Sequence, residues 1–112
     1  MTQMGETVSI GEFRRLDIRV GTVVEVGRIP GSKSLYRMRV DLGGEVRQIV
    51  AGLVGYYTEE ELMGKRIVVI RNLKPAKIFG VLSNGMLLAA EHGEELALLT
   101  VDRDIPNGAR VT

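Results

Sequence analysis

A two-residue period in hydrophobicity dominates the first half of this chain and constrains its fold most strongly. Beyond residue 17, apolar or β-branched side chains fall on alternate positions, the spacing at which a β-strand presents one face to a core: Ile18, Val20, Thr22, Val24 and Val26. Residues 36–41 alternate in the same way, and residues 45–51 follow after the paired glycines 43–44, which suit a hairpin turn. The pattern predicts three strands in a meander.

Glycine and proline indicate where these segments turn. Gly21 and Gly27 interrupt the first strand. Because they add no side chain to the sheet, they predict a bulge and a sharp bend, as a small barrel requires. Pro30 and Gly31 predict a turn in the loop of residues 29–34 that leads to the second strand.

Two capping boxes predict two short helices. Ser9 is followed three residues later by Glu12, and Thr58 by Glu61, so each pair can satisfy the free N–H groups of a helix start. Gly64 follows the last turn of the second helix, as is common at helix ends.

The second half of the chain predicts two more strands and a long connection. Residues 66–71 are nearly all apolar, which indicates a strand covered on both faces. Residues 86–90 predict a fifth strand, and residues 96–100 are compatible with one more. Between the fourth and fifth strands, residues 72–85 lack obvious regular structure and exceed the usual connection length, which makes them a candidate functional loop. Residues 101–112 remain as a tail.

Three strands, a helix and two strands separated by a large loop follow the order of an OB-fold. We therefore expect an all-β protein: a five-stranded OB-fold barrel with a short helix between strands three and four, a short N-terminal helix and a C-terminal extension. We expect residues 9–112 to form a single domain. Ligands of such barrels lie across strands two and three, between the loops that join strands one to two and four to five.

Composition argues against catalysis. The chain of 112 residues has no cysteine and one histidine, His92, so it offers no thiolate and no second nitrogen ligand for a transition metal. The acidic run 59–61 is explained by the start of a helix, and residues 80–85 lack the Gly-Lys-Ser/Thr ending of a phosphate-binding loop. We expect no enzyme, no cofactor and no metal.

The sequence also predicts a cytoplasmic protein. No apolar run approaches the roughly 20 residues of a membrane span, and the first residues lack the features of a signal peptide. The lack of cysteine fits a reducing compartment.

Charge is unevenly distributed although the net charge is only +1. Residues 14–47 hold eight basic and four acidic side chains, and residues 65–77 hold five basic and no acidic ones. Gathered on one side of the fold, these stretches would present a basic face to a polyanion. Charges of both signs interspersed over a solvated surface are equally compatible with the counts.

Cations near the two expected binding loops are suited to phosphate contacts: Lys33, Arg37, Arg39, Arg71, Lys74 and Lys77. The candidate stacking groups are Tyr36, Tyr56, Tyr57 and Phe79, and for Tyr36 and Phe79 a place in the core is an equal alternative. Aromatic residues make up 4% of the chain and tryptophan is absent, which favours recognition of folded RNA by shape and backbone over base-by-base stacking.

Five stretches, in their order and spacing, resemble the tRNA-binding domain family: residues 17–21 (DIRVG), 35–36 (LY), 48–52 (QIVAG), 72–77 (NLKPAK) and 83–89 (SNGMLLA). The resemblance extends over residues 13–112. This family includes the C-terminal domain or separate beta subunit of methionyl-tRNA synthetases, stand-alone structure-specific tRNA-binding proteins and cytokine-like cofactors of synthetases.

The resemblance implies an OB-fold that binds tRNA through its folded L shape, without reading the anticodon, and that often delivers tRNA to a synthetase. By motif position, it implies tRNA-binding roles for Asn72, Lys74, Lys77, Ser83 and Met86, supported by Lys33, Tyr36 and Arg37. The lysines would meet phosphates, Asn72 and Ser83 would hydrogen-bond the backbone or base edges, and Met86 would pack on apolar RNA surface. Stand-alone members are homodimers, which implies a dimerisation extension over about residues 91–112 that uses Leu96, Leu98 and Leu99.

The chain departs from the family pattern at three positions. Ser34 stands where a lysine is usual, beside Lys33, and Ala76 and Phe79 stand where an arginine can occur. The resemblance therefore implies shifted contacts in the first loop and weaker affinity.

Two other functions are compatible with this fold. Some relatives are similar to export-related chaperones that bind unfolded polypeptide, a function that needs an exposed apolar groove. The presence of Lys74, Pro75 and Lys77 in the long loop favours RNA binding over this chaperone function. A module that only docks onto a synthetase is the third possibility.

Overall fold

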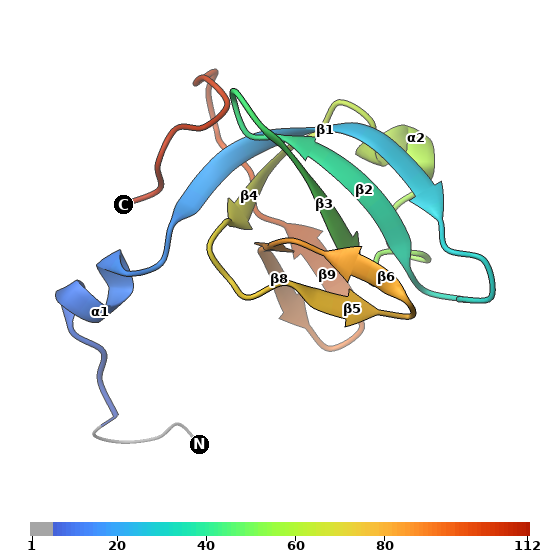
Figure 1. The fold of residues 1–112 in the computed structure, drawn as a ribbon, viewed down its shortest axis with the longest axis horizontal. Coiled ribbons are helices and arrows are strands. Elements are labelled where there is room, and N and C mark those ends of the chain that lie inside the picture. Colours follow the sequence, from blue (N-terminus) through green and yellow to red (C-terminus); the bar gives the residue numbers. More distant parts are fainter. Residues whose placement is uncertain (1–5) are drawn as a thin grey trace.

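The computed structural model describes residues 6–112 and consists mainly of short antiparallel strands (Figure 1). Along the chain the elements are α1 (Ile10–Arg14), β1 (Ile18–Arg28), β2 (Tyr36–Asp41), β3 (Val46–Ala51), α2 (Glu59–Leu62), β4 (Arg66–Ile70), β5 (Ala76–Ile78), β6 (Val81–Ser83), β7 (Met86–Leu87), β8 (Ala89–His92) and β9 (Glu95–Leu98). The order from α1 to β4 follows the sequence prediction.

Five strands form one antiparallel sheet in the order β3-β2-β1-β4-β7. Its two outer strands approach each other, since the backbone N–H of Asn84, just before β7, donates to the carbonyl of Gln48 in β3 at 2.7 Å. The sheet is thereby nearly closed into an OB-like barrel, which confirms the predicted fold class.

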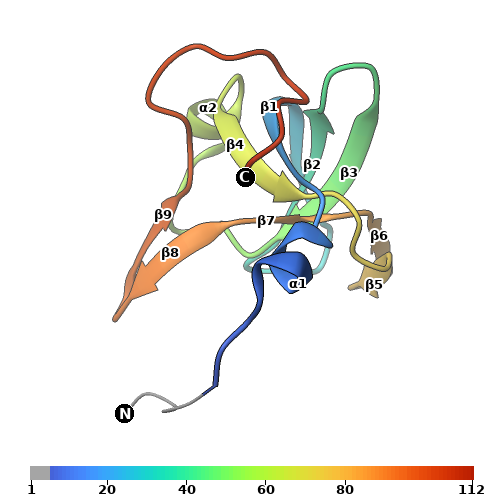
Figure 2. The same cartoon turned by 90° about the vertical axis from the view of Figure 1, so that its left-hand side faces the viewer.

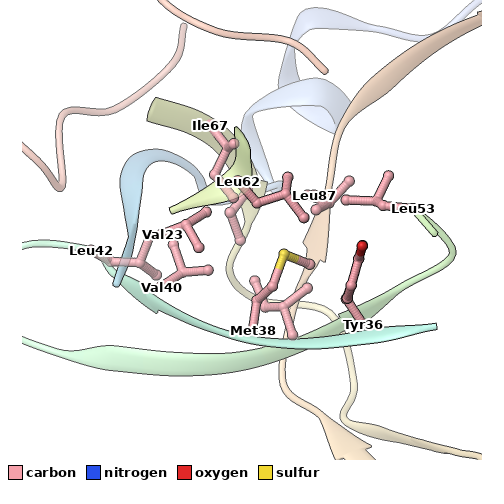
Figure 3. Close-up of a cluster of buried hydrophobic side chains, with 11 residues drawn as sticks. Val23, Tyr36, Met38, Val40, Leu42, Leu53, Leu62, Ile67 and Leu87 are labelled. Carbon is pink, nitrogen blue, oxygen red and sulfur yellow. The ribbon is translucent and has the colours of Figure 1, made fainter. Parts of the chain in front are cut away.

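The barrel interior is filled by alternate side chains of its strands (Figure 3). Tyr36, Met38 and Val40 of β2 all point inward, as the period of two predicts. Leu62 of α2 is fully buried and joins the same cluster, so this short helix closes part of the core. A second cluster covers the other face of β4, which confirms that this strand is buried on both sides.

Both predicted capping boxes are present. The Ser9 hydroxyl accepts the N–H of Glu12 and the Glu12 carboxylate accepts the N–H of Ser9, each at 3.0 Å. Thr58 and Glu61 make the equivalent pair at 3.1 and 2.8 Å. Each helix therefore begins where the spacing of its cap predicts.

Gly21 is required for a reason other than a bulge. The irregularity in β1 lies between Val23 and Glu25, where its register against β2 shifts. A Cβ at position 21 would instead lie 2.7 Å from side-chain atoms of both Val40 and Leu42. Gly21 therefore permits a close approach of β1 to the chain at the end of β2.

The second half of the chain corrects two expectations. Residues 72–85 are not devoid of regular structure, because β5 and β6 form a hairpin within them. Residues 86–90 are not one strand: β7 pairs with β4, whereas β8 pairs with β9 in a separate hairpin. Leu88 lies between the two pairings, and its N–H donates to the carbonyl of Val68 at 2.9 Å.

The C-terminal tail belongs to the barrel rather than to a free extension (Figure 2). The N–H of Gly108 donates to the carbonyl of Val20 at 2.7 Å, and the N–H of Val111 donates to the carbonyl of Ile18 at 2.8 Å. Val20 in turn donates to the carbonyl of Ala109 at 2.9 Å. The tail thus covers the edge of β1 that β2 leaves unpaired.

Candidate nucleic-acid interface

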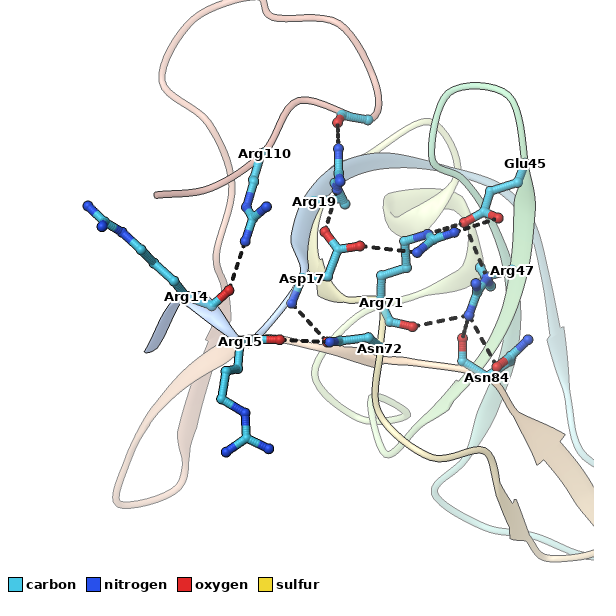
Figure 4. A network of polar contacts seen from close by, with 11 residues as sticks. Arg14, Arg15, Asp17, Arg19, Glu45, Arg47, Arg71, Asn72, Asn84 and Arg110 are labelled. Atoms are coloured by element: carbon cyan, nitrogen blue, oxygen red, sulfur yellow. Dashed lines mark hydrogen bonds and ion pairs between the residues drawn. The ribbon is translucent and has the colours of Figure 1, made fainter. Parts of the chain in front are cut away.

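Arg71, directly after β4, is the centre of a polar network at one end of the barrel (Figure 4). Its guanidinium donates to the carboxylate of Glu45 through two nitrogens and to that of Asp17 at 3.1 Å. Hydrogen bonds from arginine lower both carboxyl pKa values, that of Asp17 chiefly through Arg19 and that of Glu45 chiefly through Arg71. Arg71 is therefore neutralised within the protein.

Asn72 ties the start of the β5–β6 hairpin to the N-terminal part of the chain. Its amide nitrogen donates to the carbonyl of Arg15, and its amide oxygen accepts the N–H of Asp17, both at 2.8 Å. These bonds join the residue after β4 to the connection between α1 and β1, while Asn72 itself remains exposed.

Arg47 and Gln48 of β3 hold the hairpin from the other side. The Arg47 guanidinium donates to the carbonyl of Arg71 at 3.1 Å and to Oδ1 of Asn84 at 3.2 Å, and these two residues flank the hairpin. The side-chain amide of Gln48 donates to the carbonyl of Leu82 in β6 at 2.8 Å. Both ends of the hairpin and one of its strands are therefore fixed to the barrel.

Ser83 is buried, with 5% of its surface exposed. Its hydroxyl accepts the backbone N–H of Val50 at 3.0 Å and donates to the carbonyl of Gly85 at 3.1 Å. Ser83 thus joins β3 to β6, and both of its hydrogen bonds in the structure are to the protein backbone.

Three of the residues expected to contact RNA, Lys74, Lys77 and Met86, have exposed side chains. Neither lysine forms an ion pair with any of residues 6–112. Lys77 lies opposite Leu82 in the hairpin, and both point away from the barrel side on which Ser83 is buried. The hairpin and the residues beside it therefore present to solvent two lysines that form no ion pair within residues 6–112, together with apolar side chains that include Leu82 and Met86.

The first loop and β2 contribute a second group of cations. Lys33 and Arg39 are exposed, whereas Arg37 pairs with Glu25 at 3.2 Å. Tyr36 is in the core, and its hydroxyl donates to the carbonyl of Tyr57 at 2.8 Å. Of the two alternatives for Tyr36, stacking on RNA or packing in the core, the structure shows packing in the core.

These two groups share one surface. Arg39 of β2 lies opposite Gln48 of β3, and Gln48 holds the strand of Leu82, which lies opposite Lys77. A polar surface with cations at both sides therefore runs across β2, β3 and the β5–β6 hairpin, where an OB-fold binds its ligands.

The three leucines expected at a dimer interface, Leu96, Leu98 and Leu99, differ in how exposed they are. Leu96 and Leu98 of β9 are half-buried and pack against the core of the same chain. Leu99 is 39% exposed. The side of the β8–β9 hairpin opposite Leu96 and Leu98 is lined by exposed residues, among them Ala90 and Ala97, which pair with each other.

Sequence reasoning missed Arg47, Gln48 and Asn84, the residues that fix the hairpin. Gln48 and Asn84 belong to two of the family motifs, but their role in fixing the hairpin is not visible in the sequence, because the three residues meet only when β3 closes on β7. Among residues 6–112, no three acidic or histidine side chains gather to hold a metal, and no helix is long and apolar enough to cross a membrane.

Comparisons with known proteins agree with this geometry. A family model described as "Putative tRNA binding domain" matches residues 18–110. Methionine–tRNA ligase of Methanocaldococcus jannaschii is 55% identical over 107 residues, which is 95% of this chain and 16% of that protein. The ligase of Thermococcus kodakarensis is 54% identical over 106 residues, again 95% of this chain and 14% of that protein. The chain thus spans about a sixth of these relatives.

Two solved structures share the fold over nearly the whole chain. A MetRS-related protein from Pyrococcus horikoshii superposes with a TM-score of 0.90 and 39% identity, covering 96% of this chain and 99% of that one. A CsaA chaperone from Bacillus anthracis superposes with a TM-score of 0.87 and 27% identity, covering 96% of this chain and 100% of that one. Since the family model covers most of the barrel and the polar surface described above, the chain belongs to the tRNA-binding domain family.

Proposed function

We propose that this protein binds tRNA through the shape and phosphate backbone of the folded molecule, without reading its sequence. The observation that carries the proposal is the pair of exposed lysines 74 and 77, which form no ion pair within residues 6–112 and lie on, or just before, a hairpin that the barrel holds in place. Cations of this kind contact phosphates, which carry no sequence information. The domain is a non-catalytic module that works in the cytoplasm.

The expected binding residues act in two ways under this proposal. Lys33, Arg37, Lys74, Lys77 and Met86 reach the RNA from the exposed surface. Asn72, Ser83 and Tyr36 act indirectly, because their polar atoms are engaged in holding the two loops. A pre-positioned surface loses less conformational entropy when it binds.

The partner we propose is methionyl-tRNA synthetase. The relatives that carry this domain within a longer chain are methionine–tRNA ligases. A separate copy of the domain can supply the same tRNA-binding surface as a beta subunit, and a stand-alone tRNA-binding factor is the other form of the same function.

We also propose a homodimer in which exposed residues of the C-terminal part, Leu99 among them, meet their counterparts across a two-fold axis. Two weak basic surfaces related by symmetry hold one tRNA at an effective concentration that neither provides alone.

A titration of total tRNA against an unstructured RNA of equal length tests the proposal. Filter binding at about 50 and 200 mM salt should show tighter binding of tRNA and a strong loss of affinity at the higher salt. Equal affinity for the two RNAs would contradict recognition of the folded shape.

A second function, binding of unfolded polypeptide, is favoured by the similarity to a CsaA chaperone. Exposed apolar side chains such as Leu73 and Leu82 offer contacts for such a ligand. Suppression of aggregation of a model protein, with no retention of tRNA at low salt, would favour this function over the first.

A further inference from the structure

Phe79 adopts a backbone conformation that its residue type disfavours. It lies with Gly80 at the tip of the β5–β6 hairpin, between Ile78 and Val81, which pair with each other. Its φ is 55°, and it is the only non-glycine residue with positive φ among residues 6–112. Gly80 has a φ of 81°, so both central residues have the left-handed conformation of a two-residue type I′ turn. Asparagine or glycine satisfies that position with less strain than phenylalanine.

Core packing does not account for an aromatic residue at this tip. The Phe79 side chain is 58% exposed and belongs to neither hydrophobic cluster of the described chain. The strained backbone at Phe79 thus costs stability, and the mostly exposed ring gains little from burial to offset that cost. Strained positions of this kind concentrate at functional sites, where the surrounding structure holds them.

The surroundings of Phe79 suit a flat, negatively charged ligand. The hairpin tip and the loop between β1 and β2 lie side by side (Figure 1), and a Cβ at Gly31 would lie 3.3 Å from Cε2 of the Phe79 ring. Lys77 precedes the tip by two residues, and Lys33 follows Gly31 by two residues. Both lysines are exposed. The Phe79 ring therefore lies close to the loop between β1 and β2, with an exposed lysine two residues from each side of this contact.

We propose that Phe79 stacks on an unpaired base of the bound RNA while Lys33 and Lys77 contact the adjoining phosphates. This inference rests on the tRNA-binding function proposed above and adds to it one base-contacting residue. Stacking needs only the flat face of a base, so the contact is independent of sequence. It directs the domain to RNA in which bases are unpaired, such as the loops and the end of a folded tRNA.

Substitution of Phe79 by asparagine separates stacking from folding. Asparagine suits the turn, so Phe79→Asn should unfold at the same temperature as the parent protein or a higher one. It should weaken binding of total tRNA about tenfold. Binding of a blunt-ended, fully paired RNA duplex should not change, and neither should the salt dependence, because no charge is lost.

Substitution by tryptophan gives a direct signal. The chain contains no tryptophan, so Phe79→Trp places a single indole at the tip. Saturating tRNA should quench its emission, and affinity should equal or exceed that of the parent. Ile105→Trp, at an exposed position of the C-terminal tail, is the matched control and should retain its emission.

The outcomes separate the two proposals. If the parent prefers tRNA but Phe79→Asn binds it equally well, or if the indole at position 79 is not quenched, stacking is wrong and the tRNA-binding function stands. If the parent shows no preference for tRNA, both proposals are wrong. Quenching by an unfolded polypeptide, without quenching by tRNA, would assign the tip to protein binding and overturn the stacking proposal.

Discussion

The hydroxyl of Ser83 accepts the backbone N–H of Val50 at 3.0 Å, and this bond joins β6 to β3 inside the protein. Ser83→Ala leaves that buried N–H without a partner, so the free energy of unfolding should fall by about 1–3 kcal/mol. Denaturant titration measures the change. Ser34→Ala, at an exposed position of the first loop, is the matched control and should stay within about 0.5 kcal/mol of the parent. Equal stability of the two variants would contradict the structural role of Ser83.

Replacement of Lys74 and Lys77 by alanine should weaken tRNA binding without affecting stability. Both side chains are exposed and lack an ion pair within residues 6–112. Each lysine that contacts a phosphate contributes about one unit to the slope of log affinity against log salt concentration. The slope of the double variant should therefore fall by about two.

The control for that experiment is Arg103→Ala, which removes an exposed cation from the C-terminal tail, where it pairs with Asp102. Its affinity and salt slope should match those of the parent. An unchanged affinity of the Lys74→Ala, Lys77→Ala protein would remove the hairpin from the RNA-binding surface.

Gly21→Ala should destabilise the barrel. The added methyl group would lie 2.7 Å from both Val40 and Leu42, and overpacking of this kind costs about 1–3 kcal/mol. Gly11→Ala is the contrasting variant, since its Cβ would lie 3.8 Å from Ser9 Oγ on the exposed helix α1. There alanine should stabilise by about 0.5–1 kcal/mol. Thermal unfolding of the two variants should give shifts of opposite sign.

Stability should fall as the solution becomes acidic. The pKa values of Asp17 and Glu45 lie below their ordinary values of 3.8 and 4.5 in the folded protein, because arginines hydrogen-bond the charged forms. A carboxyl group whose pKa is lower in the folded than in the unfolded protein stabilises the folded state at pH values above its unfolded pKa. This contribution to the free energy of unfolding is lost as the pH falls below about 4.5. Unfolding measured from pH 7 to pH 3 should follow this course.

The double variant Asp17→Asn, Glu45→Gln identifies the source of that dependence. It should be less stable than the parent at pH 7 and should lose less stability on acidification. A residual loss is expected from Glu12, whose pKa the bonds of its capping box with Ser9 also lower. An acid dependence identical to that of the parent would exclude the Arg71 network as its cause.

Leu99→Glu should convert the proposed dimer into a monomer, because a charge buried without a partner at an interface is costly. Sedimentation velocity at micromolar concentration measures the mass. Val46→Glu, at an exposed position of β3 outside the C-terminal part, should remain dimeric. A monomeric parent protein would contradict the dimer itself.

Sequence patterns predicted both helices and the order of elements from α1 to β4, because these depend on local signals. Met38 and Val40 alternate with arginines in β2, and the Ser9–Glu12 and Thr58–Glu61 pairs form their boxes within a single turn. The two-residue turn at Phe79 escaped prediction, since Phe-Gly is not a typical sequence for a turn with two positive φ values. The β5–β6 hairpin was therefore expected to be irregular.

The sequence by itself determined the barrel, the cations and the motifs of the family. Only the tertiary structure decided which of the residues in these motifs face solvent. The motif positions predict RNA contacts for both Asn72 and Ser83, but the folded barrel buries Ser83 against Val50 and leaves Asn72 exposed. Burial and hydrogen-bond partners come from strands far apart in sequence, and for that reason local pattern cannot separate a residue that touches a ligand from one that holds the loop in place.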